Sequence, residues 1–488
     1  MAVQYMRHAS FYTMWCGLCF LIRCLSEILI ALLRAPYEVL FHKTSSPPRL
    51  YFVENSFNKD VVSRCSSLAY FKELWWATGG HVQTFLMACM PPPKREYRRE
   101  SIYLPRDGVH VSVDWLEGDS VTPESPIVLI LHGLGGSSTA SRSVQLLAGQ
   151  VAIRGYRAAV YNRRGHGFNS LLPTKTEAAA GLAPSRGQRL KSALKERTME
   201  CQCAPIFPKH VNMEDMEAVV THLQNLYPEA NKYLIGLSCG ANLAVQYIAR
   251  AGSSSPFLAT ASVSNGYNIY EGSAILKKDP IVDGLATQML RDILGEGRLP
   301  ECIQLAREAG IQIDFDAVMS SRSLQDFESL IVLPAYGYSS LEEYYDEVSC
   351  HYNIQRVVSP LLCICCEQDP MVHTSMTEIP IAAAQTNENI LTVVTKGGGH
   401  IGWFDDEAFN GGVGQWYIRL FMEYIHTITE LHKEKKKLDS QVRSRGRSQS
   451  RSRLRRSSSS HKDVGEAPVS QVRTKKVRVR KGRSKSRG

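Results

Sequence analysis

Short apolar stretches alternate with longer amphipathic stretches along most of this chain. Five stretches rich in β-branched and other apolar residues are typical of buried parallel strands, at 127 to 133, 157 to 165, 232 to 238, 360 to 369 and 390 to 398. Segments of helical length follow or separate them, at 213 to 227, 241 to 250 and 413 to 433. The alternation predicts an α/β fold with a mainly parallel sheet and helices on both faces.

Two stretches interrupt this alternation. Residues 171 to 209 are rich in Lys, Glu, Ala and Ser and lack core periodicity, so we expect an inserted surface loop. Residues 267 to 350 have a helical composition and lie where lids over active sites are commonly inserted, so we expect a helical lid. The regular alternation begins after three consecutive prolines, which places the catalytic domain at 94 to 432 and a lead-in at 1 to 93.

The positive charge of the chain is concentrated at its C-terminal end. The formal net charge is +10, but residues 433 to 488 alone hold 21 Lys or Arg against 4 Asp or Glu. The remaining residues therefore carry about −7 by the same counting. We expect the Arg/Ser/Lys-rich tail to be disordered, because it has almost no apolar residues to bury. Anionic lipid or nucleic acid is the partner that its positive charge favours, and a solvated tail without a dedicated partner is the alternative.

One N-terminal segment, 11 to 33, has the length of a membrane span. Arg23 and Glu27 interrupt it, four residues apart, so on a helix they share a face. The segment fits a span, an interfacial helix or a helix packed on the domain. We expect membrane association, with a single pass through an endomembrane as one arrangement and the side of the membrane left open.

The thirteen cysteines do not suggest a disulfide framework, since those in 360 to 369 lie in a predicted central strand. Cys16 and Cys19 have metal-binding spacing, but no second Cys/His pair follows at zinc-finger distance. We expect neither a metal nor another cofactor.

A G-x-S-x-G motif at 236 to 240 lies between a predicted strand and a predicted helix. In that setting Ser238 occupies a tight, strained turn that exposes its hydroxyl above the sheet. The backbone N–H of Cys239 then points to the place where an oxyanion forms, and Leu134 N–H, in the glycine-rich loop after an earlier strand, is our second candidate donor. That loop also fits an ordinary tight turn with a packed His132.

Two further residues follow predicted strands in the order Ser, Asp, His. Asp369 ends a strand, and His400 follows three glycines after the next one. A serine hydroxyl needs a base such as His400, which in turn needs a carboxylate to hold its tautomer. Ser238, Asp369 and His400 therefore form a candidate triad of an α/β-hydrolase fold, with Glu367 as a fallback acid and His373 as a fallback base.

Several longer motifs resemble the type-4 family of AB-hydrolase-domain proteins, which includes membrane-anchored lipid hydrolases, yeast medium-chain ethyl-ester acyltransferases and bacterial esterases. The similar segments lie at 78 to 84, where Gly79 replaces the usual Asn, and at 107 to 115, 132 to 134, 162 to 165, 264 to 266, 369 to 370 and 398 to 402. The resemblance covers roughly residues 70 to 430. It implies the same triad, an N-terminal membrane anchor as in many relatives, and acyl esters as substrates, such as monoacylglycerols, phospholipids or medium-chain esters.

Other functions stay open at this stage. His400 and Asp405 fit an H-x-x-x-x-D pattern that is linked to acyl transfer in related lipid enzymes, so transfer to an alcohol is an alternative to hydrolysis. A catalytically idle hydrolase fold with its function in the basic tail is another. The leading hypothesis is a serine esterase or lipase that forms an acyl-enzyme on Ser238.

Overall fold

The computed structural model describes residues 2–41, 45–105, 108–170, 209–295, 298–406 and 415–459. The chain divides into two compact units, Met1–Thr429 and Glu430–Gly488. Nearly all of the predicted surface loop at 171 to 209 lies outside the described residues.

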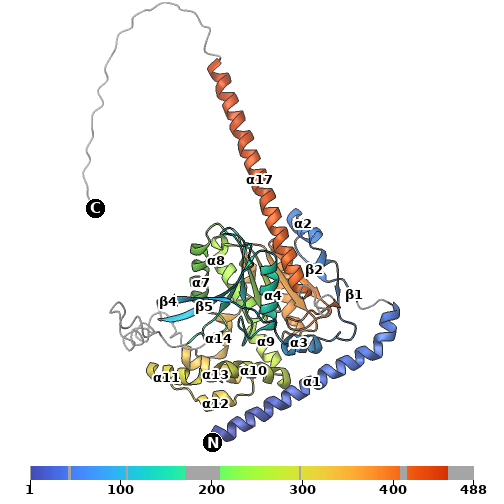
Figure 1. The fold of residues 1–488 in the computed structure, drawn as a ribbon, viewed down its shortest axis with the longest axis vertical. Helices are drawn as coiled ribbons and strands as arrows, with labels where there is room; N and C mark the ends of the chain where they lie inside the picture. The colour runs from blue at the N-terminus through green and yellow to red at the C-terminus, as the bar shows by residue number, and fades with distance from the viewer. Residues whose placement is uncertain are drawn as a thin grey trace, which may run out of the picture. The chain divides into compact units, whose positions relative to one another are not determined.

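A nine-stranded sheet forms the centre of the first unit (Figure 1). Its strand order is β2-β11-β10-β9-β8-β6-β7-β5-β4. The strands are β2 (Arg49–Tyr51), β4 (Arg98–Leu104), β5 (Val109–Leu116), β6 (Ile127–Leu131), β7 (Arg157–Asn162), β8 (Lys232–Leu237), β9 (Phe257–Val263), β10 (Leu361–Cys366) and β11 (Ile390–Thr395).

The inner part of the sheet is parallel and its edges are antiparallel. Strands β7, β6, β8, β9, β10 and β11 pair in parallel, whereas β4, β5 and β2 pair antiparallel at the two sides. Strands β6, β7, β8, β10 and β11 are buried at every position, which explains why they appear in the sequence as continuous apolar stretches. The predicted α/β fold with a mainly parallel sheet is confirmed.

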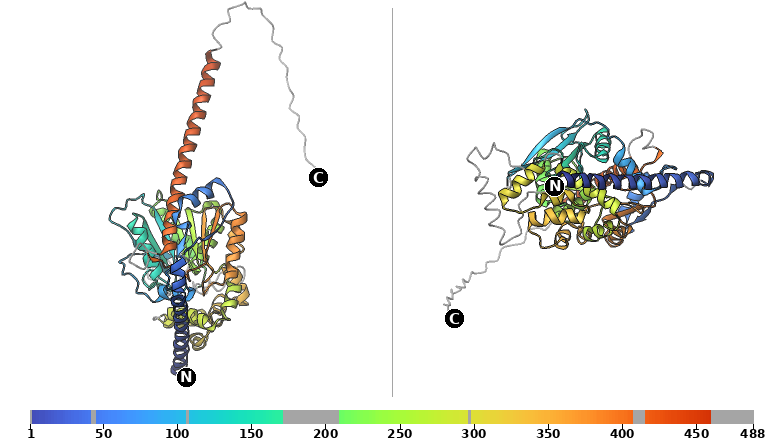
Figure 2. Two further views of the ribbon diagram at one scale, coloured as in Figure 1. Left: turned by 90° about the vertical axis from the view of Figure 1, so that its right-hand side faces the viewer. Right: turned by 90° about the horizontal axis from the view of Figure 1, so that it is seen from below.

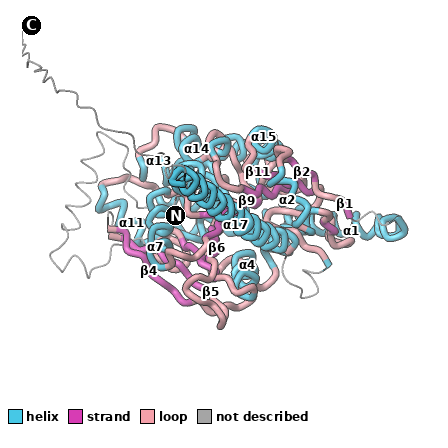
Figure 3. The backbone as a smooth tube through the Cα atoms, turned by 90° about the horizontal axis from the view of Figure 1, so that it is seen from above, coloured by secondary structure: helices cyan, strands magenta, loops and turns pink. Residues whose placement is uncertain are grey.

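Helices cover both faces of this sheet (Figure 3). Among the helices that contact its strands are α4 (Arg142–Ile153), α7 (Met213–Leu226), α8 (Cys239–Ala251) and α15 (Glu378–Thr386). On α7, Met216, Val219, Val220 and Leu223 are all buried, as their helical spacing predicts. The side chain of Asn212 caps this helix by accepting a hydrogen bond from Asp215 N–H.

The residues before Lys94, expected as a lead-in, contribute to the catalytic unit itself. Strand β2 pairs with β11 at the edge of the main sheet, and β1 (Ser45–Ser46) pairs with β3 (Phe71–Lys72). The helices of this region are α1 (Ala2–Phe41), α2 (Ser56–Arg64) and α3 (Gly80–Cys89).

Six α-helices lie between β9 and β10 in the described residues, in the stretch whose composition predicts helices. They are α9 (Ile269–Leu276), α10 (Pro280–Gly295), α11 (Leu299–Ala309), α12 (Phe315–Ser320), α13 (Leu324–Tyr336) and α14 (Leu341–Val348). Side chains of Asn268, Asp314, Ser323 and Ser340 cap four of them by accepting a backbone N–H.

Helix α17 (Trp416–Ser459) begins in the first unit and ends in the second. Its first turns supply buried residues to the core, whereas the side chains from Lys433 to Gln441 are exposed. Helical backbone thus extends to Ser459, well into the region expected to be disordered, while residues 460 to 488 lie outside the described part.

Candidate active site

Ser238 lies in the sharp turn between strand β8 and helix α8. Its backbone angles are φ 54° and ψ −120°, a conformation that is strained for a residue with a side chain. A Cβ atom at Gly236 would lie 2.2 Å from the carbonyl oxygen of Gly240, and one at Gly240 would lie 2.3 Å from the carbonyl oxygen of Leu131. Both glycines are therefore required by the close approach of the chain, as the G-x-S-x-G motif predicts.

Replacing Gly240 with alanine is expected to destabilise the protein by about 1–3 kcal/mol, because the new methyl group meets backbone atoms that cannot rotate away. Gly17→Ala is the matched control, since a Cβ atom there has no neighbour within 4 Å. Urea unfolding of both variants measures the effect. Equal midpoints for the two variants would mean that the turn accepts a side chain at Gly240.

The structure brings Ser238, Asp369 and His400 together from three separate loops at the carboxyl edge of the sheet. His400 Nε2 lies 3.0 Å from Ser238 Oγ. His400 Nδ1 lies 2.9 Å from Asp369 Oδ2 and 3.0 Å from Asp369 Oδ1. With Nδ1–H donating to the carboxylate, Nε2 is the ring atom that accepts the hydroxyl proton.

The Asp369 carboxylate is fixed by the turn that follows strand β10. Its Oδ1 accepts hydrogen bonds from the backbone N–H groups of Met371 and Val372, both at 2.9 Å. The side chain is almost fully buried. These bonds orient both oxygens toward His400.

The loop that holds His400 is supported by residues for which the sequence suggested no role. Thr84 Oγ accepts from His400 N–H at 2.8 Å, and Glu73 Oε1 accepts from Gly398 N–H at 2.8 Å. Ser264 Oγ accepts from Ile401 N–H at 3.1 Å. Thr84 and Ser264 lie in the family-like motifs at 78 to 84 and 264 to 266. These motifs were the feature of the sequence that could have indicated their supporting role.

Two opposing effects act on the pKa of His400. Burial lowers it, whereas the Asp369 carboxylate raises it, and the net direction is above the ordinary imidazole value. The imidazolium that forms during catalysis by a serine nucleophile is therefore stabilised at this position.

Two backbone segments border Ser238, the first turn of helix α8 and the loop that contains Gly133. Cys239 is the first residue of helix α8, so its N–H belongs to the group that has no partner within the helix. Gly133 packs directly on Ser238, because a Cβ atom at Gly133 would lie 3.2 Å from Ser238 Cβ. Leu134 follows Gly133 in the same loop, and Arg163 Nη2 braces this loop by donating to Gly133 O at 3.1 Å.

His132 is packed within the core. Its Nδ1 lies 2.8 Å from Gly133 O, and its ring centroid lies 4.8 Å from that of His166. Burial and the nearby Arg163 guanidinium hold the pKa of His132 well below its usual range. The imidazole is thus neutral and supports the loop structurally.

Two cationic side chains, His210 and Arg163, lie near the Cys239 thiol. His210 Nε2 lies 2.6 Å from Glu328 Oε1, and although burial lowers the pKa of His210, Glu328 raises it to about 10. Burial raises the pKa of the Cys239 thiol, but the His210 imidazolium and the Arg163 guanidinium together lower it to about 7.

A cleft lies between the loop that contains Leu134 and the helices between β9 and β10, and the three triad residues are not among the residues that line it. Its lining combines cationic and polar groups with apolar side chains from helices α10 and α13. The lining residues are Leu134, Arg163, His166, Lys209, His210, Leu290, Ile293, Phe327, Glu328, Val332 and Tyr344. Such a mixed lining suits a substrate with one polar and one apolar part.

The two fallback residues do not reach the Ser238 site. Glu367 pairs with Arg49 on strand β2. His373 caps a short 3₁₀ helix, where its Nδ1 accepts from Ser375 N–H at 3.2 Å.

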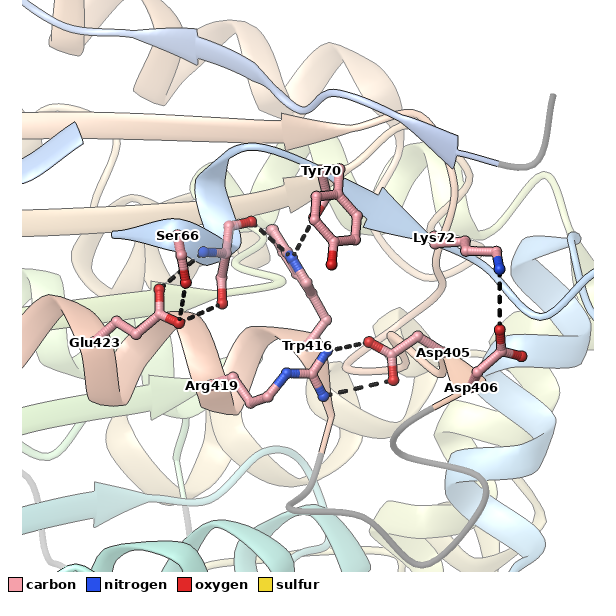
Figure 4. Close-up of a pocket in the computed structure, with 9 residues that line it drawn as sticks. Ser66, Tyr70, Lys72, Asp405, Asp406, Trp416, Arg419 and Glu423 are labelled. Atoms are coloured by element: carbon pink, nitrogen blue, oxygen red, sulfur yellow. Dashed lines mark hydrogen bonds and ion pairs between the residues drawn. The ribbon is translucent and has the colours of Figure 1, made fainter. Parts of the chain in front are cut away.

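Asp405, the acidic residue of the H-x-x-x-x-D pattern, also points away from His400. Figure 4 shows its carboxylate paired with Arg419 in a separate polar pocket, beside Lys72 and Asp406, which pair at 3.2 Å. The pattern therefore provides no second carboxylate for His400. Among the described residues, no group of three or more His, Cys, Asp or Glu side chains is placed to hold a metal ion.

The model of the alpha/beta hydrolase fold family matches residues 126–407. The chain belongs to this family. Phospholipase ABHD3 of Mus musculus is 27% identical over 402 residues, which cover 79% of this chain and 87% of the relative. Monoacylglycerol lipase ABHD2 of Mus musculus is 23% identical over 419 residues, which cover 80% and 88%. The finer type-4 assignment stays a prediction from the motifs.

A solved structure, the esterase Pf2001 of Pyrococcus furiosus, is 16% identical, with a TM-score of 0.36 over 64% of this chain and 90% of that chain.

Proposed function

We propose that this protein is a serine hydrolase of carboxylic esters that forms an acyl-enzyme on Ser238. The observation that carries the proposal is the continuous hydrogen-bonded series from Ser238 Oγ through His400 to Asp369, with distances of 3.0 and 2.9 Å. An isolated serine hydroxyl is a poor nucleophile, and this series is the arrangement that activates it.

In the proposed reaction, His400 Nε2 takes the proton of Ser238 as Oγ attacks the ester carbonyl carbon. Asp369 stabilises the imidazolium, which then donates that proton to the departing alcohol. A water molecule, deprotonated by the same nitrogen, attacks the acyl carbon; the bond to Ser238 Oγ then breaks, the imidazolium returns its proton to Oγ, and the acid is released. The backbone N–H groups of Cys239 and Leu134 are the proposed donors to the oxyanion in both steps.

Lipid acyl esters are the substrate class that we propose. The relatives are named as a phospholipase and a monoacylglycerol lipase, and both names describe cleavage of esters in lipids. The cleft beside Leu134 supports this class, since Leu290, Ile293, Phe327 and Val332 supply an apolar wall. We propose that the helices between β9 and β10 form the lid over this cleft.

Acyl transfer to an alcohol gains no separate support from the H-x-x-x-x-D pattern, because Asp405 pairs with Arg419.

We further propose that the protein associates with a membrane, since α1 contains one segment, Thr13–Arg34, long and apolar enough to cross one. The basic tail is a candidate for anionic lipid or nucleic acid.

A fluorophosphonate probe tests the proposal directly, because it reacts with activated serines. The full-length protein is expected to be labelled, with the adduct mapped by mass spectrometry to Ser238. Prior incubation with a monoacylglycerol or a phospholipid should slow the labelling. Absence of labelling, or an adduct on another residue, would contradict the proposed nucleophile.

A further inference from the structure

The residue after Ser238 carries a thiol that the triad does not use. Cys239 is the first residue of helix α8 and is partly exposed. Its backbone N–H is a proposed oxyanion donor, whereas its side chain lies near His210 and Arg163. A covalent change at this sulfur therefore occurs one residue away from the nucleophile.

Cys239, His210 and Glu328 form a second hydrogen-bonded series beside the triad. The His210 side chain is hydrogen-bonded to the Cys239 thiol. Its Nε2 also lies 2.6 Å from Glu328 Oε1, and both members of this pair are largely buried. A thiol, an imidazole and a carboxylate in this order favour the thiolate, because the imidazolium stabilises the negative sulfur and the carboxylate stabilises the imidazolium.

The thiols of strand β10 provide the contrast. Burial raises the pKa of Cys363 to about 12, and it also holds the pKa values of Cys365 and Cys366 well above the ordinary thiol value. At Cys239 burial acts in the same direction, but His210 and Arg163 outweigh it and lower the pKa to about 7. A large fraction of the Cys239 thiol is therefore ionised at neutral pH, whereas the thiols of β10 stay protonated.

Arg163 adds a free donor to this group. Arg163 is 7% exposed, its Nη1 donates to His210 O at 3.2 Å, and its Nη2 donates to Gly133 O at 3.1 Å. The third nitrogen of the guanidinium, Nε, is buried and has no hydrogen-bond partner within the part of the chain that the structure describes. A buried donor without an acceptor favours the binding of a small molecule with an oxygen atom.

The cleft next to the Leu134 loop gives a small molecule access to this group. Arg163, His210 and Glu328 all line that cleft. The helices between β9 and β10, which form its other wall, lie below the strands in the left view of Figure 2, in yellow-green and yellow. A small oxidant that enters between these helices and the loop meets the side chains that hold the Cys239 thiol.

We propose that Cys239 is a site of reversible oxidation by hydroperoxides, and that its oxidation lowers the activity of Ser238. The effect on Ser238 rests on the proposed function. In the oxidation step the Cys239 sulfur attacks one oxygen of hydrogen peroxide, the O–O bond breaks, and the sulfur becomes a sulfenic acid. The sulfur thereby loses two electrons to the peroxide. The departing hydroxide takes a proton from the His210 imidazolium and leaves as water, while Arg163 Nε is the donor available to the peroxide oxygen.

A soluble thiol reverses this change in two steps. The first thiol attacks the sulfenic sulfur, forms a mixed disulfide with Cys239 and releases water. A second thiol attacks that disulfide, leaves as part of a small disulfide and restores the Cys239 thiol.

Oxidation at Cys239 removes a negative charge that acts on the triad. The Cys239 thiolate is one of the groups that raise the pKa of His400, and a neutral sulfenic acid no longer stabilises the His400 imidazolium. The same series extends to the proposed lid, since Glu328 on α13 accepts a hydrogen bond from Tyr345 OH on α14 at 2.5 Å. Loss of the thiolate therefore weakens both the catalytic base and the attachment of the lid.

Competition between two cysteines of the same chain tests the oxidation site. The reduced, full-length protein is treated at neutral pH with hydrogen peroxide and dimedone, which traps sulfenic acids, and peptide mass spectrometry measures each adduct. Cys89 is the matched control, because it is more exposed than Cys239 but partial desolvation raises the pKa of its thiol. Exposure alone predicts faster trapping at Cys89, whereas a thiolate at Cys239 predicts trapping there about tenfold or more faster.

Two histidine variants test the role of the imidazolium. His210→Gln should slow trapping at Cys239 about tenfold or more and leave Cys89 unchanged, because the Cys239 thiol loses the cation that favours its ionised form. His222→Gln is the matched control. It makes the same change at a histidine that also pairs with a carboxylate, Glu100 at 2.8 Å, and it should leave both rates at their wild-type values.

Inhibition is measured separately from trapping. Peroxide at a dose that fully oxidises Cys239 should lower kcat/KM for a soluble ester about tenfold or more, and dithiothreitol should restore it. Trapping at Cys239 that is no faster than at Cys89, or that His210→Gln leaves unchanged, would overturn the oxidation site. Full oxidation of Cys239 with unchanged hydrolysis would overturn its control of Ser238. A reduced wild type that hydrolyses no ester would contradict the proposed function alone, and the trapping rates would still decide the oxidation site.

Discussion

Replacing Ser238 with alanine is expected to lower the kcat for ester hydrolysis by about 10⁴-fold or more, because it removes the hydroxyl that lies in front of His400 Nε2. The change removes a single oxygen atom, so the fold and the affinity for substrate should persist. Initial rates with a chromogenic short-chain ester, under saturating substrate, measure the loss.

Ser63→Ala is the control for this variant. The Ser63 hydroxyl is exposed and donates to Asp60 O within helix α2, so its removal should leave the rate unchanged. Thermal unfolding of both variants checks that the proteins remain folded. A rate for Ser238→Ala within tenfold of wild type would mean that the nucleophile lies elsewhere.

Five of the six parallel inner strands were predictable from the sequence because they are buried on both faces, whereas β9 (Phe257–Val263) was not among the predicted stretches. Continuous apolar stretches such as the one containing Cys363 to Cys366 have few alternatives to a central strand. Strand β2 escaped the prediction, since it has only three residues and pairs at the edge. Short edge strands have too little apolar pattern to distinguish them from loops.

The candidate triad was predictable for a topological reason. Parallel strands all end at the same edge, so residues that follow β8, β10 and β11 must gather there. The supports of the triad were not predictable in the same way. Glu73 and Thr84 lie more than 300 residues from the loop that they hold, and only tertiary contacts reveal the pairing.

The N-terminal segment shows the limit of local reasoning most clearly. Its length and composition fit a span, an interfacial helix or a packed helix equally well. Arg23 and Glu27 are four residues apart on one helix face, a spacing at which opposite charges can partly offset each other. In the folded chain Arg23 pairs with Asp279 and Glu27 pairs with His81 instead. Neither partner can be identified from the N-terminal segment alone.

Replacing Asp369 with asparagine is expected to reduce kcat by about 10⁴-fold, because an amide that donates to His400 Nδ1 selects the wrong tautomer. Nε2 would then carry the proton and be unable to accept one from Ser238. Glu367→Gln is the matched control. It makes the same chemical change two residues earlier in the chain, at a carboxylate that pairs with Arg49 instead. Near-normal activity is expected for this control.

The pH profile provides a second and independent readout of the same substitution. In the wild type, kcat/KM should fall as pH drops through the pKa of His400, which lies above the ordinary imidazole value because the Asp369 carboxylate outweighs burial. Without that carboxylate the largest effect that raises the pKa of His400 is gone, so the inflection of the residual activity should move to lower pH. Glu367→Gln should leave the inflection in place. A profile that shifts in the control but not in Asp369→Asn would assign the acid to Glu367, and Asp369 would then be only the cap of its own turn.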